Sequence, residues 1–246
     1  ILLIPNFAAL AAIKECAAKG VKGVVLFTAG FKETGTQEGA NLEREIVQIA
    51  QAANMRLIGP NGMGFYVPKS GLSFIPGLSK QIGPISVVSH SGSLANILCR
   101  MSPQKGIYFN KVISLGNECD LKSSDFFHYF ANDEQSKVIG AYIEGISEGK
   151  KFIESIKSVA SVKPVVLWKV GLTKEGERAA ASHTGALGSS KEVWSGMMSQ
   201  FGVTTVSGFE AWVDMLLGFM LLPQGLGKNI AIISGPGGLA VSAAEA

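Results

Sequence analysis

Apolar runs rich in β-branched residues alternate along the chain with longer segments of helical periodicity. The apolar runs, each a predicted strand, cover residues 1–4, 22–27, 56–59, 85–88, 111–115, 138–143, 164–168, 203–206 and 229–233. The helical segments cover 7–19, 41–54, 92–102, 123–131, 149–160, 190–201 and 208–221. Short, continuously apolar strands separated by helices are typical of parallel sheets covered on both faces. The pattern predicts an α/β protein with doubly wound, mainly parallel sheets and ligand sites at the carboxyl ends of its strands.

Two breaks in this pattern predict linkers. Residues 68–84 are irregular and rich in Pro, Gly and Ser, and residues 223–227 read Pro-Gln-Gly-Leu-Gly. The expected units are 1–76, 77–222 and 223–246, of which only the middle one is a complete domain. The chain opens on Ile1 and stops at Ala246 inside a helical pattern, so we expect it to belong to a longer protein.

Composition narrows the classes of function. The 246 residues are 47% hydrophobic, which is enough to bury real cores. The net charge of +3 comes without a block of Lys or Arg, which argues against nucleic acid and anionic membranes as partners. No apolar run reaches the ~18 residues that span a bilayer. Cys16, Cys99 and Cys119 are odd in number and lack metal-ligand spacing, so we expect neither disulfides nor a metal site, in a cytoplasmic protein.

A turn of small residues follows the strand at 85–88 and precedes a helix. It reads Ser-His-Ser-Gly-Ser at 89–93. The N–H groups and the dipole of a helix N-terminus attract anions, which makes this turn a candidate phosphate site. Gly92 lets the backbone approach an oxyanion, and Ser91 or Ser93 can add a hydroxyl donor. His90 can add a further donor, while the alternative for the whole turn is N-capping by serine.

His183 lies in a run of small residues, Ser-His-Thr-Gly-Ala at 182–186. Imidazole titrates near neutrality, so it can act as a nucleophile, and the glycines suit a mobile carrier of a phosphoryl group. An ordinary solvated histidine is the alternative. Glu144 follows the strand at 138–143, where its carboxylate can hydrogen-bond one ring nitrogen of such a histidine. Taken alone, Glu144 is better explained as a solvent-exposed loop acid.

Two further turns are weaker candidates. Gly-Pro-Asn-Gly at 59–62 follows a strand, and Asn61 can bind a ligand or its own backbone. Gly-Pro-Gly-Gly at 235–238 follows the run at 229–233 and is similar to a second strand-to-helix anion turn. His128 and the three tryptophans are expected to be packing residues.

Seven short motifs occur in order along almost the whole chain. They are Ala-Gly-Phe-Lys-Glu-Thr-Gly at 29–35, Ile-Gly-Pro-Asn-Gly at 58–62, Val-Val-Ser-His-Ser-Gly at 87–92, Ser-Leu-Gly-Asn at 114–117, Ile-Glu-Gly at 143–145, Lys-Pro-Val-Val at 163–166 and Ser-His-Thr-Gly-Ala at 182–186. This order resembles the nucleoside-diphosphate-forming acyl-CoA synthetases. That family includes the ADP-forming acetyl-CoA synthetases and, more distantly, the α subunit of succinyl-CoA synthetase. The last motif resembles the family's phosphohistidine loop and is the most specific.

The resemblance implies a fold and a reaction. Residues 1–76 would be the C-terminal part of a CoA-binding Rossmann-like domain, 77–222 a flavodoxin-like CoA-ligase domain, and 223–246 the start of a further flavodoxin-like domain. The family interconverts acyl-CoA, phosphate and ADP with carboxylate, CoA and ATP, through an acyl phosphate and a phosphohistidine. Coenzyme A is therefore an expected ligand. ATP or ADP and Mg²⁺ are expected at an ATP-grasp module, fused or separate, that these residues do not contain.

The resemblance also implies roles for single residues. His183 would carry the phosphoryl group and Glu144 would orient it. The phosphate-binding residues would be Ser89, Ser91, Gly92 and Ser93. The residues near the substrate and CoA would be Asn61, Gly62 and Asn117. At the position of His90 relatives more often have Gln or Arg.

The implied partners are a small carboxylate, CoA, phosphate and the ATP-grasp domain or subunit, within an oligomer. A second hypothesis from a different class is a CoA-sensing or regulatory module that keeps the fold without ligase activity. A third is a protein that uses the same fold for other chemistry. His183 and Glu144 favour the enzyme, since a sensor needs no phosphoryl carrier.

Overall fold

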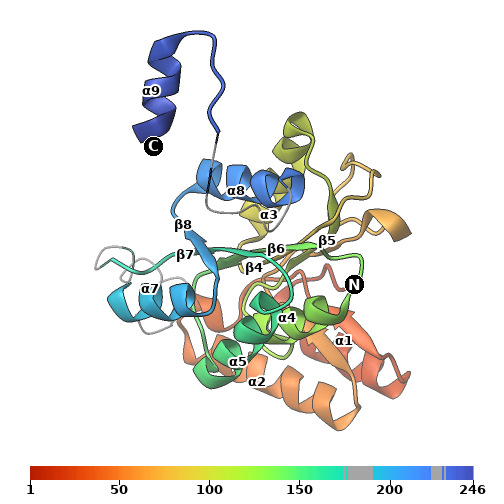
Figure 1. The fold of residues 1–246 in the computed structure, drawn as a ribbon. Coiled ribbons are helices and arrows are strands. Elements are labelled where there is room, and N and C mark those ends of the chain that lie inside the picture. The colour runs from red at the N-terminus through yellow and green to blue at the C-terminus, as the bar shows by residue number, and fades with distance from the viewer. Residues whose placement is uncertain (174–175, 177–190, 223–228, 230, 246) are drawn as a thin grey trace.

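The computed structural model describes residues 1–173, 176, 191–222, 229 and 231–245 (Figure 1). The main elements are α1 (Asn6–Ala18), β1 (Gly23–Val25), α2 (Gln37–Ala52), β2 (Arg56–Ile58), β3 (Gly64–Tyr66), β4 (Ile85–Ser89), α3 (Gly92–Met101), β5 (Phe109–Ser114), α4 (Ser123–Asn132), β6 (Val138–Ile143), α5 (Gly149–Ala160), β7 (Val165–Lys169), α7 (Lys191–Gln200), β8 (Thr204–Val206), α8 (Phe209–Leu221) and α9 (Gly237–Glu245). His183 lies outside the described residues.

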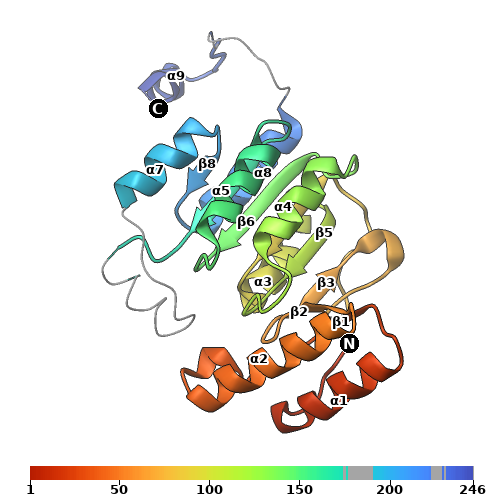
Figure 2. The ribbon, with the colours of Figure 1, turned by 90° about the horizontal axis from the view of Figure 1, so that it is seen from below.

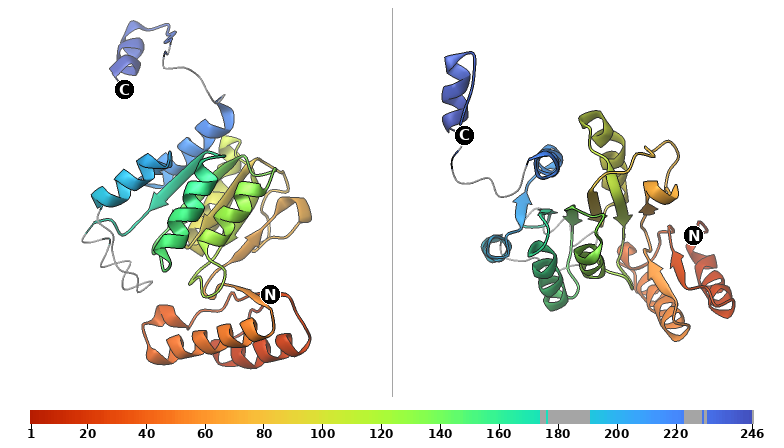
Figure 3. Two further views of the ribbon diagram at one scale, coloured as in Figure 1. Left: turned by 60° about the horizontal axis from the view of Figure 1, so that its bottom comes forward. Right: turned by 45° about the vertical axis from the view of Figure 1, so that its right-hand side comes forward.

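A six-stranded sheet in the order β3-β5-β4-β6-β7-β8 forms the centre of the molecule. Its neighbouring strands are parallel except for β3 and β5, which are antiparallel. Helices α4, α5 and α7 pack on one face and α3 and α8 on the other (Figure 3). Because apolar helices cover both faces, the strands β4 and β6 are almost continuously buried, as the alternating pattern predicts. The α/β fold with mainly parallel strands is confirmed.

A second, small sheet consists of β1 and β2 in parallel register. Its alternate residues face opposite ways. Val24 and Leu57 pack with α1 and α2 in one core, whereas Val25 and Ile58 pack with the core of the large sheet. The small sheet therefore lies against the large domain, with α1 and α2 on its outer side (Figure 2). No helix in the described part of the chain is long and apolar enough to cross a membrane.

The strands differ from expectation at three places. Residues 229 and 231–233 form no strand, and Ile233 is 98% exposed. A strand needs a hydrogen-bonded neighbour, and none of the described residues pairs with this segment. At 1–4, only Leu2 forms a bridge, with Leu26. The strand β3 was not expected, because three residues are too few to show a period.

The strand β3 also bears on the expected division of the chain. It lies inside 1–76, yet it hydrogen-bonds to β5 of the large sheet. The chain therefore enters the large sheet before the irregular segment that the composition suggested as a linker. At the other end, α9 buries none of its residues.

Candidate functional site

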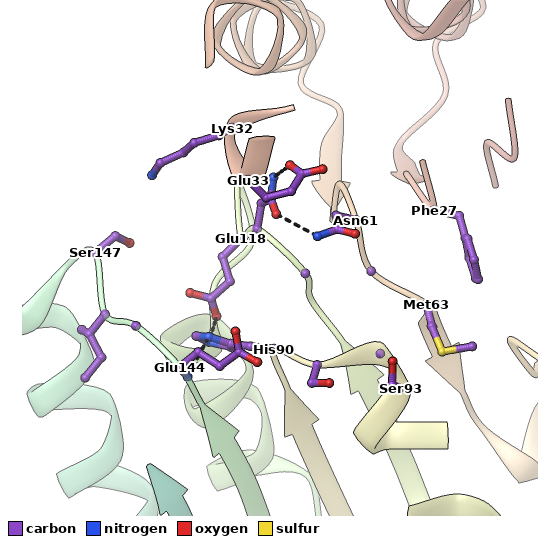
Figure 4. Close-up of a pocket in the computed structure, with 17 residues that line it drawn as sticks. Phe27, Lys32, Glu33, Asn61, Met63, His90, Ser93, Glu118, Glu144 and Ser147 are labelled. Atoms are coloured by element: carbon purple, nitrogen blue, oxygen red, sulfur yellow. Dashed lines mark hydrogen bonds and ion pairs between the residues drawn. The ribbon is translucent and has the colours of Figure 1, made fainter. Parts of the chain in front are cut away.

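The carboxyl ends of several strands surround a pocket of about 530 Å³ (Figure 4). Its lining comes from residues 27, 32–33, 61–63, 90–93, 116–118 and 144–147. Seven of the residues predicted from sequence line it, namely Asn61, Gly62, Ser91, Gly92, Ser93, Asn117 and Glu144. Ser89 lies directly behind the lining and is fully buried. The structure therefore brings the predicted residues together, except for His183, which lies outside the described part.

The turn at 89–93 is held by its own hydroxyl groups. The Ser91 side chain accepts a hydrogen bond from the N–H of Leu94 at 3.2 Å, and the Ser89 hydroxyl donates to the Ser91 carbonyl at 2.8 Å. The capping function predicted for serine is therefore present. Gly92 begins α3, and a β-carbon there would lie 2.6 Å from Cγ of Met63. At Gly92 the start of α3 therefore lines the pocket with its backbone alone. This arrangement suits the binding of an anion.

His90 has its side chain turned into the protein beside the pocket. Its Nδ1 accepts a hydrogen bond from the backbone N–H of Glu144 at 3.2 Å. Its Nε2 lies 3.0 Å from Oε1 of Glu118 in an ion pair that lacks the alignment of a good hydrogen bond. Burial opposes a charge on the imidazole, but the carboxylates of Glu118 and, to a smaller extent, Glu144 together raise the pKa of His90. Burial alone would raise the pKa of Glu118, but His90 and the N–H of Ser123 lower it.

Glu144 comes immediately after β6 and is half-buried at the pocket. Its backbone carbonyl accepts a hydrogen bond from Nζ of Lys169 at 3.0 Å. Burial lowers the pKa of Lys169, an effect that the Glu144 carboxylate opposes. Burial, followed by the same carboxylate, raises the pKa of Tyr142 to about 12. Contacts on both its N–H and its carbonyl therefore fix the backbone of Glu144.

Asn117 holds three polar groups together at the far side of the pocket. Its Nδ2 donates to Oε2 of Glu33 at 2.5 Å and to Oε2 of Glu43 at 2.9 Å. Its Oδ1 lies 3.5 Å from Nδ2 of Asn61. Oε1 of Glu33 in turn accepts the N–H of Gly30 at 2.6 Å. The amide of Asn117 is thus engaged within the protein, where it ties the loop after β5 to the small sheet's loops.

Two glycines allow the loops after β2 and β5 to touch along their backbones. Gly116 has a φ of +57°, and a β-carbon there would lie 2.1 Å from the carbonyl oxygen of Pro60. A β-carbon on Gly62 would lie 2.9 Å from the backbone of Ser114. The N–H of Asn117 donates to the Pro60 carbonyl at 2.9 Å across this contact. Side chains at either glycine would separate the loops that carry Asn61 and Asn117.

The charged groups at the pocket are mostly acidic. Glu33, Glu118 and Glu144 line it, with Lys32 as the cation on the same loop as Glu33. Within the described residues, no group of three or more His, Cys, Asp or Glu is placed to hold a metal ion. Sequence reasoning gave no role to Glu33, Glu43 or Glu118, because acids that lie on a 3-10 turn, on α2 and on the loop after β5 share no local spacing.

Fold and site together define a class, a flavodoxin-like α/β domain with a polar pocket at the carboxyl ends of its strands. Residues 82–219 match the family model of the succinyl-CoA ligase like flavodoxin domain. The chain therefore belongs to this family.

Named relatives extend the likeness over the whole chain. Acetate–CoA ligase (ADP-forming) I of Archaeoglobus fulgidus is 39% identical over 100% of this chain and 36% of its own length. Subunit alpha of acetate–CoA ligase (ADP-forming) II of Pyrococcus furiosus is 38% identical over 100% of this chain and 53% of its own. This chain thus spans about a third to a half of these relatives.

A solved structure shows the same arrangement. The apo form of the dinucleotide-forming acetyl-coenzyme A synthetase 1 of Ca. Korarchaeum cryptofilum superposes with a TM-score of 0.90 at 30% identity, covering 99% of this chain and 53% of that one. Its complex with phosphate and ADP superposes with a TM-score of 0.82 at 33% identity, over 89% of this chain and 47% of that one.

Proposed function

We propose that this chain is the α-type module of an ADP-forming acyl-CoA synthetase. The observation that carries the proposal is the convergence of a glycine-opened helix start, the carboxylate of Glu144 and the Asn61 turn on one pocket. These are the positions at which the family resemblance expects phosphate, the histidine-orienting acid and CoA. The names of the relatives, which are acetate–CoA ligases, support the same reaction.

In the proposed mechanism, the start of α3 holds phosphate through the backbone at Gly92 and Ser93. A phosphate oxygen attacks the thioester carbonyl of acyl-CoA, the C–S bond breaks, and CoA leaves as a thiolate that takes up a proton. The N-terminal N–H groups stabilise the negative charge of the acyl phosphate that results.

His183 then attacks the phosphorus of the acyl phosphate, and the P–O bond to the acyl group breaks to release the carboxylate. Glu144 accepts a hydrogen bond from the other ring nitrogen and stabilises the positive charge on the imidazole. The phosphoryl group passes to ADP at an ATP-grasp module, where Mg²⁺ would neutralise phosphate charge.

The finer division of the fold is part of the proposal. Residues 1–76 belong to a CoA-binding Rossmann-like domain, 77–222 to the ligase domain and 223–246 to a further flavodoxin-like domain. With these bounds, the first unit contributes β3 as an edge strand to the sheet of the second. The ATP-grasp module is a fused domain or a separate subunit, as the subunit name of one relative suggests, and the assembly is an oligomer.

The test is phosphorylation of the full-length protein, with its ATP-grasp partner, by labelled ATP and Mg²⁺. We expect an acid-labile, base-stable label that ADP discharges and that is lost in His183→Ala. His128→Ala is the matched control, because His128 is exposed on α4, and it should keep the label. Absence of label in a folded protein that still binds CoA would contradict the proposal and leave a CoA-sensing module.

A further inference from the structure

The imidazole of His90 links three loops of the pocket from behind. His90 is 8% exposed and belongs to the turn at 89–93. Its backbone N–H donates to the Tyr142 carbonyl at 3.1 Å, so the turn is anchored to β6. Its Nδ1 accepts the N–H of Glu144, and its Nε2 faces Glu118 (Figure 4). One side chain therefore contacts the residue after β6 and the loop after β5.

Glu118 is itself held in one place. It is 8% exposed, its φ is +54°, and its Oε1 accepts a hydrogen bond from the N–H of Ser123 at 2.5 Å. Ser123 is the first residue of α4, so the carboxylate lies at a helix N-terminus, where the dipole favours its negative charge. A fixed anion beside Nε2 favours the tautomer with its proton on Nε2, which leaves the Nδ1 lone pair free to accept.

These contacts leave His90 no nitrogen for a ligand in the pocket. Nδ1 already receives the Glu144 N–H, and Nε2 lies 3.0 Å from Oε1 of Glu118 in a buried ion pair. The role of an extra phosphate donor, which its place in the turn suggested, therefore does not fit this geometry. The geometry instead fits a side chain that holds a neighbouring residue in place.

We propose that His90, held by Glu118, is a positioning residue that fixes Glu144 relative to the phosphate-binding turn. Glu144 follows β6 directly, and its neighbour Gly145 has no side chain to anchor it. The bond from its N–H to Nδ1, together with the bond from Lys169 to its carbonyl, therefore sets where the carboxylate meets the incoming histidine. The catalytic part of this inference rests on the proposed function, whereas the tautomer of His90 does not.

The proposal implies a dependence on pH. Three ionisable groups act on the ring: Glu118, Glu144 and Lys169. Protonation at Nδ1 removes the acceptor and releases the Glu144 N–H. Since the Glu118 carboxylate favours the protonated ring, Glu118→Gln should lower the pKa of His90 and keep the acceptor form to more acidic pH. The acid limb of single-turnover phosphorylation should then move to lower pH.

The first test needs no turnover. In the full-length protein labelled with ¹⁵N-histidine, long-range ¹H–¹⁵N spectra at a pH above the raised pKa of His90, where the ring is neutral, should show a proton on Nε2 and none on Nδ1. The assignment comes from loss of the signal in His90→Asn. A neutral ring with its proton on Nδ1 would overturn the proposal, whatever the protein catalyses.

The second test compares His90→Asn with His90→Leu in the phosphorylation assay. The Asn side chain ends near the position of Nδ1 and can offer its Oδ1 to Glu144, whereas Leu cannot. We expect Leu to slow single-turnover phosphorylation roughly 10-fold to 100-fold, the usual cost of losing a group that orients a catalytic residue. We expect Asn to recover most of that loss at similar thermal stability.

Equal rates for His90→Leu and wild type would overturn the positioning role, as would an equal loss in both variants with both folded. Failure of the wild type to take up label would instead contradict the proposed function. In that case the tautomer spectrum still decides whether Glu118 and Glu144 hold His90 as inferred.

Discussion

Glu33 and Glu43 are two carboxylates that share one donor, the amide of Asn117. Glu43 is only 7% exposed, and burial raises its pKa more than Asn117 and the Lys32 N–H lower it. A pKa raised in the folded state means that stability is full below the unfolded pKa and falls as pH rises through the folded one. At neutral pH the ionised Glu43 therefore costs stability.

From this we predict that Glu43→Gln raises the free energy of unfolding at pH 7 more than at pH 4, because Gln keeps an acceptor for Asn117 without the buried charge. Urea unfolding at both pH values measures it. Glu45→Gln is the matched control, since that side chain is 51% exposed and its ion pair with Lys14 is worth little. A variant of Glu43 that is destabilised equally at both pH values would contradict this account.

Substitution by alanine should have opposite effects on protein stability at two glycines that lie in different elements. Gly196 lies on the exposed side of α7, and a β-carbon there would have no atom within 4 Å. Ala is a better helix former than Gly by about 1 kcal/mol, so Gly196→Ala should stabilise the protein by up to that amount. Thermal and urea unfolding measure this gain.

Gly116→Ala is the contrasting variant. Its positive φ and the 2.1 Å approach of its β-carbon to the Pro60 carbonyl require the loops after β2 and β5 to move apart. We expect a loss of stability in the same assays, together with weaker binding at the pocket. If Gly116→Ala kept or raised the stability of the protein, the close approach of these loops would be wrong.

The two sheets of the molecule are joined by Asp120 as well as by apolar packing. Its Oδ2 accepts the N–H of Leu57 at 2.8 Å and Nε of Arg56 at 2.9 Å, both from β2. Leu57 is fully buried, so removal of the carboxylate leaves a buried donor without its acceptor, at a cost of about 1–3 kcal/mol. Asp120→Ala should lose that much in the free energy of unfolding.

Arg56→Ala serves as the control, because it removes only the ion pair. The Arg56 side chain is 55% exposed, and such pairs contribute about 0–1 kcal/mol. Equal losses from the two variants would mean that the ion pair, and not the buried N–H, carries the contact between the sheets.

Periodicity and turn chemistry were enough to locate the helices α1, α3, α4, α5, α7 and α8 and the strands β4 to β8 within a few residues. They succeeded because each element has a buried face of its own. They failed where pairing decides the outcome: β3 exists because β5 offers an edge, and the apolar run at 229–233 forms no strand in the described residues. Hydrogen bonding between strands depends on a neighbouring strand, and the sequence of one segment does not reveal that neighbour.

The residues of the site also fall into those that local sequence predicted and those that it did not. Local sequence was enough to select the turn at 89–93, Asn61 and Glu144, because each follows a strand whose end must reach the same edge of a parallel sheet. It gave no sign that Glu118 faces His90, or that Asn117 bridges Glu33 and Glu43, since these partners come from segments far apart in the chain. Such contacts depend on the order of the strands and on how closely glycines let the loops approach. Both are settled by packing over the whole chain, which no single stretch of residues encodes.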